Sequence, residues 1–148
     1  RSAAGTAACS NGDRRPNTFE FGKPHAAIKV AAVRSFYKLL ERVKAIPAVV
    51  ASTEDGFEVA AYAENKAQTK RLAAMASSLS ALCDVAGEES HLGHSESVII
   101  SAAGGHILLL KVARDDLPLT LSVVAKKETV IGQALYFARM AADELQAM

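Results

Sequence analysis

The sequence contains no tryptophan, and aromatic residues make up only 5% of its 148 residues, although half of the chain is hydrophobic. A core without many aromatic rings must be built mainly from alanine, valine, isoleucine and leucine. Small aliphatic residues of this kind suit helices that pack on a sheet. The length and composition therefore predict a single domain containing both helices and strands.

Cysteine is scarce, with only Cys9 and Cys83 in the whole chain. One lies in the first segment and the other inside a helical pattern, so neither a disulfide framework nor a CxxC metal site is available. We expect Cys83 to be a small buried hydrophobe. A reducing, cytoplasmic location is the expectation that fits this cysteine usage.

The chain also lacks a strong charge of either sign, because its formal net charge is +1. No broad basic excess indicates a nucleic-acid partner, and a charge this low is compatible with an apolar face covered by self-association. The longest uncharged stretch of the sheet region, 97–110, is too short to cross a bilayer, so no transmembrane helix is expected.

The first 24 residues, RSAAGTAACSNGDRRPNTFEFGKP, differ in composition from the rest. They lack the continuous apolar segment of a signal peptide. We therefore predict a flexible tail over residues 1–24 and a folded domain over residues 25–148.

Hydrophobic periodicity and turn residues predict the order α-β-β-α-β-β-β-α. Pro47 ends the first helix, and Thr129 is predicted to cap the last one. The predicted helices cover 28–43, 66–86 and the segment after Thr129, and the predicted strands cover 48–52, 57–62, 97–103, 106–113 and 117–125. This order predicts an α+β fold in which a five-stranded antiparallel sheet, made largely of hairpins, has helices on both faces.

Two stripes run along the helix predicted at 66–86. One stripe consists mainly of large apolar residues, and the other consists of small residues that would let another backbone approach closely. The first contains Leu72, Met75, Leu79, Leu82 and Ala86, and the second contains Ala73, Ala74, Ser77, Ser78 and Ala81. Packing within one molecule explains one stripe, and a second stripe indicates a partner.

The neighbouring carboxylates Glu54 and Asp55 are the first candidates for catalysis. A catalytic pair needs a pocket that raises one pKa and a third group that positions a substrate, whereas Asp followed by Gly56 is ordinary turn chemistry. No GxSxG, GxxxxGK[ST] or GxGxxG motif is present. We interpret the pair as a turn, and we expect neither an enzyme nor a cofactor.

His91 and His94, with Glu88, Glu89 and Cys83 as further candidates nearby, form the one cluster that resembles a set of metal ligands. All of them lie in or beside a single polar loop. A structural zinc site generally needs a second closely spaced ligand pair elsewhere in the chain, and none is present. A solvated loop is the favoured interpretation, with His91 and His94 as weak metal candidates.

Two long segments resemble the Roadblock/LC7 domain family, especially its bacterial members. They are VVASTEDGFEVAAYAENKAQTKRLAAMASSLSAL and GGHILLLKVARDDLPLTLSVVAKKETVIGQALYFARMAADEL. Shared features are a strand ending in an S-x-D-G pattern, here STEDG with one additional residue, and an Ala- and Ser-rich helix after it. A glycine before an aliphatic strand, here Gly105, and a hydrophobic-Gly step into the last helix, here Ile131-Gly132, complete the match over residues 35–147.

This resemblance implies a non-enzymatic, dimerising scaffold that binds or regulates a Ras-like small GTPase. It also implies that two copies join through the strand at 97–102 and the helix at 70–83, forming one continuous sheet. The residues expected at that homodimer interface are Leu72, Met75, Ala76, Leu79, Val98 and Ile100. A small-molecule-sensing domain, or another protein-interaction domain of similar layered fold, is the alternative; the sequence gives no convergent polar groups for a pocket.

Overall fold

The computed structural model describes residues 22–147 of the chain, so Cys9 and most of the predicted tail lie outside the described residues. The described residues form three α-helices and five strands in the predicted order. The α-helices are α3 (Gly22–Arg42), α4 (Thr69–Glu89) and α5 (Ile131–Gln146), with a short 3-10 helix, η2 (Lys66–Gln68), before α4. The strands are β1 (Ala48–Thr53), β2 (Glu58–Ala63), β3 (Ser97–Ala102), β4 (Gly105–Val112) and β5 (Leu119–Lys126).

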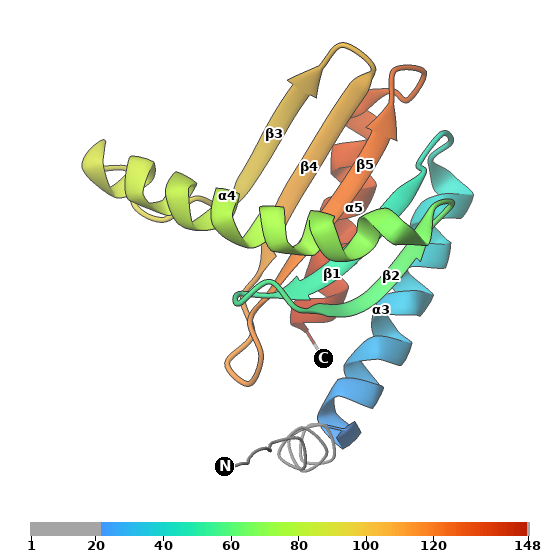
Figure 1. The fold of residues 1–148 in the computed structure, drawn as a ribbon, viewed down its shortest axis with the longest axis horizontal. Helices are drawn as coiled ribbons and strands as arrows, with labels where there is room; N and C mark the ends of the chain where they lie inside the picture. The colour runs from blue at the N-terminus through green and yellow to red at the C-terminus, as the bar shows by residue number, and fades with distance from the viewer. Residues whose placement is uncertain (1–21, 148) are drawn as a thin grey trace, which may run out of the picture.

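The strands form one antiparallel sheet in the order β2-β1-β5-β4-β3 (Figure 1). The hairpins β1–β2 and β3–β4 are both present, as the turn residues predict. The last strand, β5, lies between them and pairs with β1 on one side and β4 on the other. The strands β2 and β3 are therefore the two edges of the sheet.

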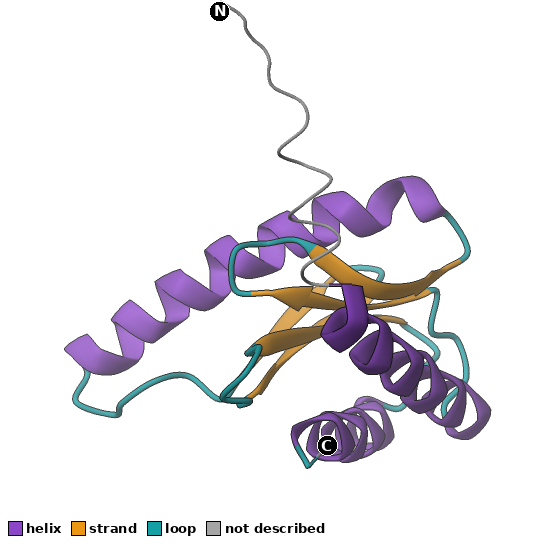
Figure 2. Cartoon of the chain, turned by 90° about the horizontal axis from the view of Figure 1, so that it is seen from below, coloured by secondary structure: helices purple, strands orange, loops and turns teal. Residues whose placement is uncertain are grey.

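Helices cover the two faces of the sheet unequally. The pair α3 and α5 packs on one face, and α4 alone packs on the other (Figure 2). The larger core lies under the pair and includes Phe36, Leu39, Leu108, Leu110 and Leu121, whereas the smaller core under α4 is built on Val50, Leu72 and Ala73. A single helix cannot cover a five-stranded sheet, so part of the second face stays open.

The first helix begins at Gly22, earlier than the predicted start at Ile28 and inside the predicted tail. Pro24 does not prevent this, because the first turn of a helix tolerates a residue that has no backbone N–H. The apolar pattern of the sequence marks only the part of α3 that packs on the core, from Ile28 onwards.

The prediction that Thr129 caps the last helix is wrong. The residue at the N-cap of α5 is Val130, which makes no capping hydrogen bond with its side chain. The Thr129 hydroxyl instead donates to the Lys44 carbonyl oxygen at 2.8 Å and lies 3.0 Å from that of Ala45. Thr129 thus ties the connection between α3 and β1 to the connection between β5 and α5.

The turn predicted between the first two strands is present, and it packs against α4. Gly56 has a φ of +91°, and a Cβ placed there would lie 3.3 Å from Ala74 Cα and from Ser77 Cβ. The Ser77 hydroxyl donates to the Glu54 carbonyl oxygen at 2.6 Å. Strand β2 begins only at Glu58, so Phe57 is exposed outside the strand in which the alternation pattern placed it.

Candidate interaction site

Helix α4 lies on the sheet with only its first half. Its buried residues are Thr69, Leu72, Ala73, Ala76 and Ser80, and none is buried from Ala81 to Glu89. Figure 1 shows the helix crossing the sheet and extending past the edge strand β3. The second half of α4 therefore overhangs the sheet.

The large apolar stripe of α4, from Met75 onwards, lies on the flank that faces the uncovered part of the sheet. Ala74 and Ser77, on the opposite flank, contact the turn between β1 and β2. Figure 1 shows this turn on one side of α4 and most of β3 and β4 on the other. Helical spacing then places the stripe with Met75 and Leu79 on the β3 and β4 side.

Strand β3 presents apolar side chains on the same face as α4. In the antiparallel register Val98 lies opposite Leu109, and Ile100 lies opposite Ile107. Opposite residues share a face of the sheet, and the row continues from Ile107 to Val124 of β5, which packs with the small core under α4. Val98, Ile100 and Ile107 are only half-buried because α4 does not cover them.

We call the apolar residues on this flank of α4 and on the uncovered part of the sheet the open surface. It consists of Met75, Leu79 and Leu82 on α4 and of Val98, Ile100 and Ile107 on the sheet. Met75 is 54% exposed and Leu82 is 67% exposed. The sheet ends here at β3, whose outer backbone groups have no strand partner among the described residues. Exposed and half-buried apolar side chains beside an unpaired strand are typical of an interaction site.

The residues that the sequence predicts for a dimer interface fall into two groups. Met75, Leu79, Val98 and Ile100 lie on the open surface, whereas Leu72 and Ala76 are buried between α4 and the sheet. An interface role for these six residues stays a prediction. Ile107 is absent from the predicted set, because its place beside Ile100 depends on the strand register.

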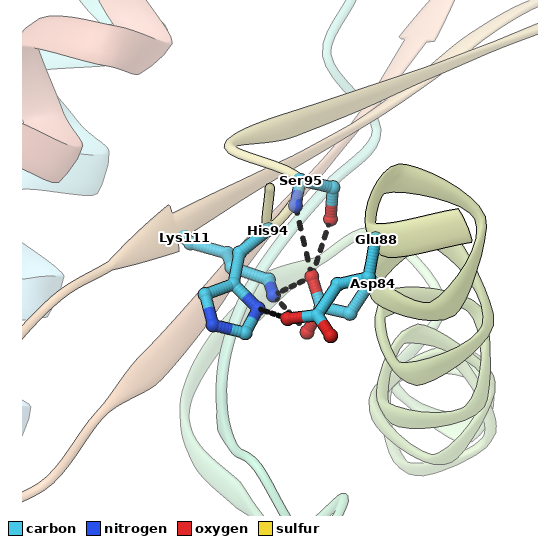
Figure 3. Close-up of polar contacts among 5 residues, drawn as sticks. All are labelled: Asp84, Glu88, His94, Ser95 and Lys111. Carbon is cyan, nitrogen blue, oxygen red and sulfur yellow. Dashed lines mark hydrogen bonds and ion pairs between the residues drawn. The ribbon is translucent and has the colours of Figure 1, made fainter. Parts of the chain in front are cut away.

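A polar cluster holds the overhanging half of α4 to the sheet. Asp84 accepts hydrogen bonds from the Ser95 backbone N–H at 3.0 Å and from the Ser95 hydroxyl at 2.8 Å. The Lys111 ammonium of β4 donates to both carboxylate oxygens (Figure 3). The hydrogen bond from Lys111, aided by those from Ser95, lowers the pKa of Asp84 from 3.8 to about 2. The carboxylate is therefore charged at neutral pH.

The loop between α4 and β3 folds back closely along the helix end. The Leu92 N–H donates to the Gly87 carbonyl oxygen at 2.8 Å. A Cβ at Gly87 would lie 2.1 Å from the Gly93 carbonyl oxygen, so a side chain at position 87 would collide with the loop. This close return places Ser95 beside Asp84.

His91 and His94, the weak metal candidates, are both exposed in this loop. His94 Nδ1 lies 3.3 Å from Glu88 Oε2, and both side chains are largely in solvent. Over residues 22–147 the structure contains no group of three or more His, Cys, Asp or Glu residues that could hold a metal ion.

A groove of about 370 Å³ runs between α3 and α5 on the other side of the molecule. Its polar side chains contact one another: Glu144 accepts from the Ser35 hydroxyl at 2.9 Å and from Lys38 Nζ at 3.1 Å. The Arg42 guanidinium lies 5.4 Å from the centre of the Phe137 ring. The hydrogen bond from Lys38 holds the pKa of Glu144 below its usual value. These groups stabilise the packing of α3 on α5 and do not converge on a free polar site.

No helix in the described part of the chain is long and apolar enough to cross a membrane.

No protein-family model matches the sequence, and no curated protein matches it. Solved structures do match. The Roadblock/LC7 domain from Streptomyces avermitilis is 20% identical, with a TM-score of 0.68 over 75% of this chain and 91% of that chain. The gliding protein MglB from Thermus thermophilus is 14% identical, with a TM-score of 0.73 over 82% of this chain and 90% of that chain.

A structure of MglB with a tetrameric arrangement is also similar. It is 15% identical, with a TM-score of 0.73 over 82% of this chain and 89% of that chain. At these identities the comparison concerns the fold, which agrees over most of each chain. The agreement confirms the resemblance seen in the sequence: the protein has the fold of the Roadblock/LC7 domains.

Proposed function

We propose that the protein is a non-enzymatic homodimeric scaffold that binds and regulates a Ras-like small GTPase. The observation that supports this proposal best is the open surface beside the unpaired strand β3. A free thiol at Cys83 suits the cytoplasmic location that is part of the proposal.

The open surface is suited to a second copy of the same chain. If two copies of β3 pair antiparallel about a two-fold axis, both edges gain backbone hydrogen bonds and one sheet continues across the dimer. The same operation brings the two open surfaces together, because a two-fold interface uses the same patch on both partners. One contact therefore covers both the exposed strand edge and the exposed apolar side chains.

The proposed dimer also creates a surface for the GTPase. Both copies of α4 would lie on the same face of the continuous sheet, which would double the exposed helical area at the centre of the assembly. The sequence resemblance to the Roadblock/LC7 family implies the class of partner, and the MglB structure with a tetrameric arrangement shows that a protein of this fold self-associates.

The homodimer is tested by measuring solution mass over a range of protein concentrations. Leu79→Glu places a charge on the open surface, where burial without a partner is costly, and we expect it to shift the protein to the monomer. Tyr136→Glu is the matched control, because Tyr136 is exposed on α5, on the opposite face of the sheet. A wild-type protein that is monomeric at every concentration would contradict the proposal.

The GTPase partner is tested by capture from source lysate supplied with a non-hydrolysable GTP analogue or with GDP. We expect one Ras-like GTPase to bind preferentially in one nucleotide state and Leu79→Glu to capture less of it. Hydrolysis by that purified GTPase, with and without this protein, then separates regulation from tethering. Failure to capture any small GTPase in either state would count against the partner while leaving the dimer intact.

A further inference from the structure

The overhanging half of α4 needs an attachment other than hydrophobic packing. From Ala81 to Glu89 no residue is buried, although the exposed Leu82 of the open surface belongs to this half. A helix end without buried apolar contacts opens at low free energy. Its position relative to β3 must therefore come from polar contacts and from the loop that follows it.

Asp84 supplies those contacts at the centre of the overhang. Figure 3 shows three segments converging on its carboxylate: α4 itself, the loop at Ser95 and strand β4 at Lys111. The side chains of Lys111 and Asp84 are 31% and 30% exposed, so water screens this pair less than it screens a fully exposed pair. We call Asp84, Ser95 and Lys111 the clamp.

We propose that the clamp is a positioning device that holds the second half of α4 at a set angle to β3 and thereby determines how strongly the open surface self-associates. This inference rests on the proposed homodimer. Asp84, Ser95 and Lys111 act through the position of the helix, and none of them is one of the residues of the open surface.

The physical reason is preorganisation. If the overhang moves freely in the monomer, association must order it, and that loss of conformational freedom reduces the affinity. The clamp orders the overhang before association. Leu82 and Leu79 on α4 are then already aligned with Val98 and Ile100 on β3 when the second copy arrives.

The test compares Lys111→Met with wild type by sedimentation analysis of dimer dissociation. Methionine keeps much of the length of lysine but removes the charge and the donor. We expect the dissociation constant to rise about five- to tenfold, within the usual range for residues that act on a site indirectly. Lys38→Met is the matched control, because Lys38 also pairs with a carboxylate, Glu144, but on the opposite face of the sheet; it is expected to leave the dissociation constant unchanged.

Hydrogen exchange distinguishes positioning from general destabilisation. In Lys111→Met we expect the backbone amides at 82–89 to lose more protection than those of the buried first half of α4 and of β1 and β5, which should change only by the loss of global stability that urea unfolding measures. An equal loss of protection throughout the sheet would contradict a local positioning role.

A second variant keeps the test decisive if Lys111→Met fails to fold. Asp84→Asn removes the same ion pair from the helix side and is expected to weaken the dimer similarly. The double variant should weaken it no more than the stronger single variant, because both changes break one interaction. Additive effects would overturn the clamp as a single unit.

The two proposals fail in different ways. If wild type dimerises and both single variants dimerise equally well, the clamp does not set the affinity and only this inference falls. If wild type does not dimerise at all, the proposed homodimer falls, and this inference falls with it.

Discussion

Single side chains in this protein act mainly by joining segments that are distant in the sequence. Thr129 connects the start of the last helix to the carbonyls that follow the first helix. Asp84 connects α4 to β4 and to the loop before β3. Glu54 and Asp55, in contrast, lie exposed in a turn whose backbone contacts α4. Thr129 and Asp84, which join distant segments, are therefore different from Glu54 and Asp55, the pair that stands out in the sequence.

The lowered pKa of Asp84 predicts a pH dependence of folding stability. The pKa of this carboxyl is about 2 in the folded state and 3.8 in the unfolded state. The group therefore stabilises the fold above pH 3.8 and loses that contribution as the pH falls towards 2. Water near this partly exposed side chain reduces the effect to on the order of 1 kcal/mol.

Urea unfolding at several pH values measures this contribution. We expect Asp84→Asn to be less stable than wild type at pH 5, and we expect the difference to shrink by pH 2. A difference that stays constant over this range would show that the Asp84 carboxylate is not stabilised in the folded protein.

At the level of secondary structure, the two hairpins depend on close backbone approaches as well as on turn residues. Gly105 begins β4 and is buried against β5, where a Cβ would lie 2.1 Å from the Ala125 carbonyl oxygen. Gly104, its neighbour in the same turn, has no atom within 4 Å of an added Cβ. The Gly pair therefore combines one glycine that the packing requires and one that it does not.

This difference predicts unequal effects of two similar substitutions. Gly105→Ala must push β4 away from β5, and we expect it to lower the free energy of unfolding by about 1–3 kcal/mol, as overpacked core sites do. Gly104→Ala should change it by less than about 0.5 kcal/mol, as surface substitutions usually do. Chemical denaturation of both variants measures the two effects, and equal values would contradict the packing argument.

The molecule as a whole has one well-covered sheet face and one partly open face. Two helices and a large apolar core stabilise the first, whereas the second depends on half of α4 and on the clamp. The protein has the fold of the Roadblock/LC7 domains. In the proposed homodimer, the second copy would cover the open surface.

If folding and dimerisation are linked in this way, thermal stability must depend on protein concentration. Dimerisation removes folded monomer from the unfolding equilibrium and so stabilises the folded state. We therefore expect the melting temperature of wild type to rise with protein concentration. Leu79→Glu should melt at a temperature that does not change with concentration. Calorimetry at several concentrations checks both statements, and a wild-type melting temperature that stays constant would contradict a reversible homodimer.

The order of helices and strands could be predicted from the sequence because it depends on local interactions. Helical periodicity, Pro47 and the Gly-containing turns specify the order of helices and strands, because each acts over a few neighbouring positions. The apolar stripe of α4 was visible for the same reason, including Met75 and Leu79. The start of α3 at Gly22 was missed because the apolar pattern ends where the helix leaves the core.

Long-range packing decided the rest. The position of β5 between β1 and β4, the uncovered half of the sheet and the place of Ile107 beside Ile100 all follow from strand pairing between distant segments. Lys111 reaches Asp84 across 27 positions of the chain, and no periodic signal marks either residue. Strand order and polar pairs of this kind depend on how the complete chain packs, so they became visible only in the folded molecule.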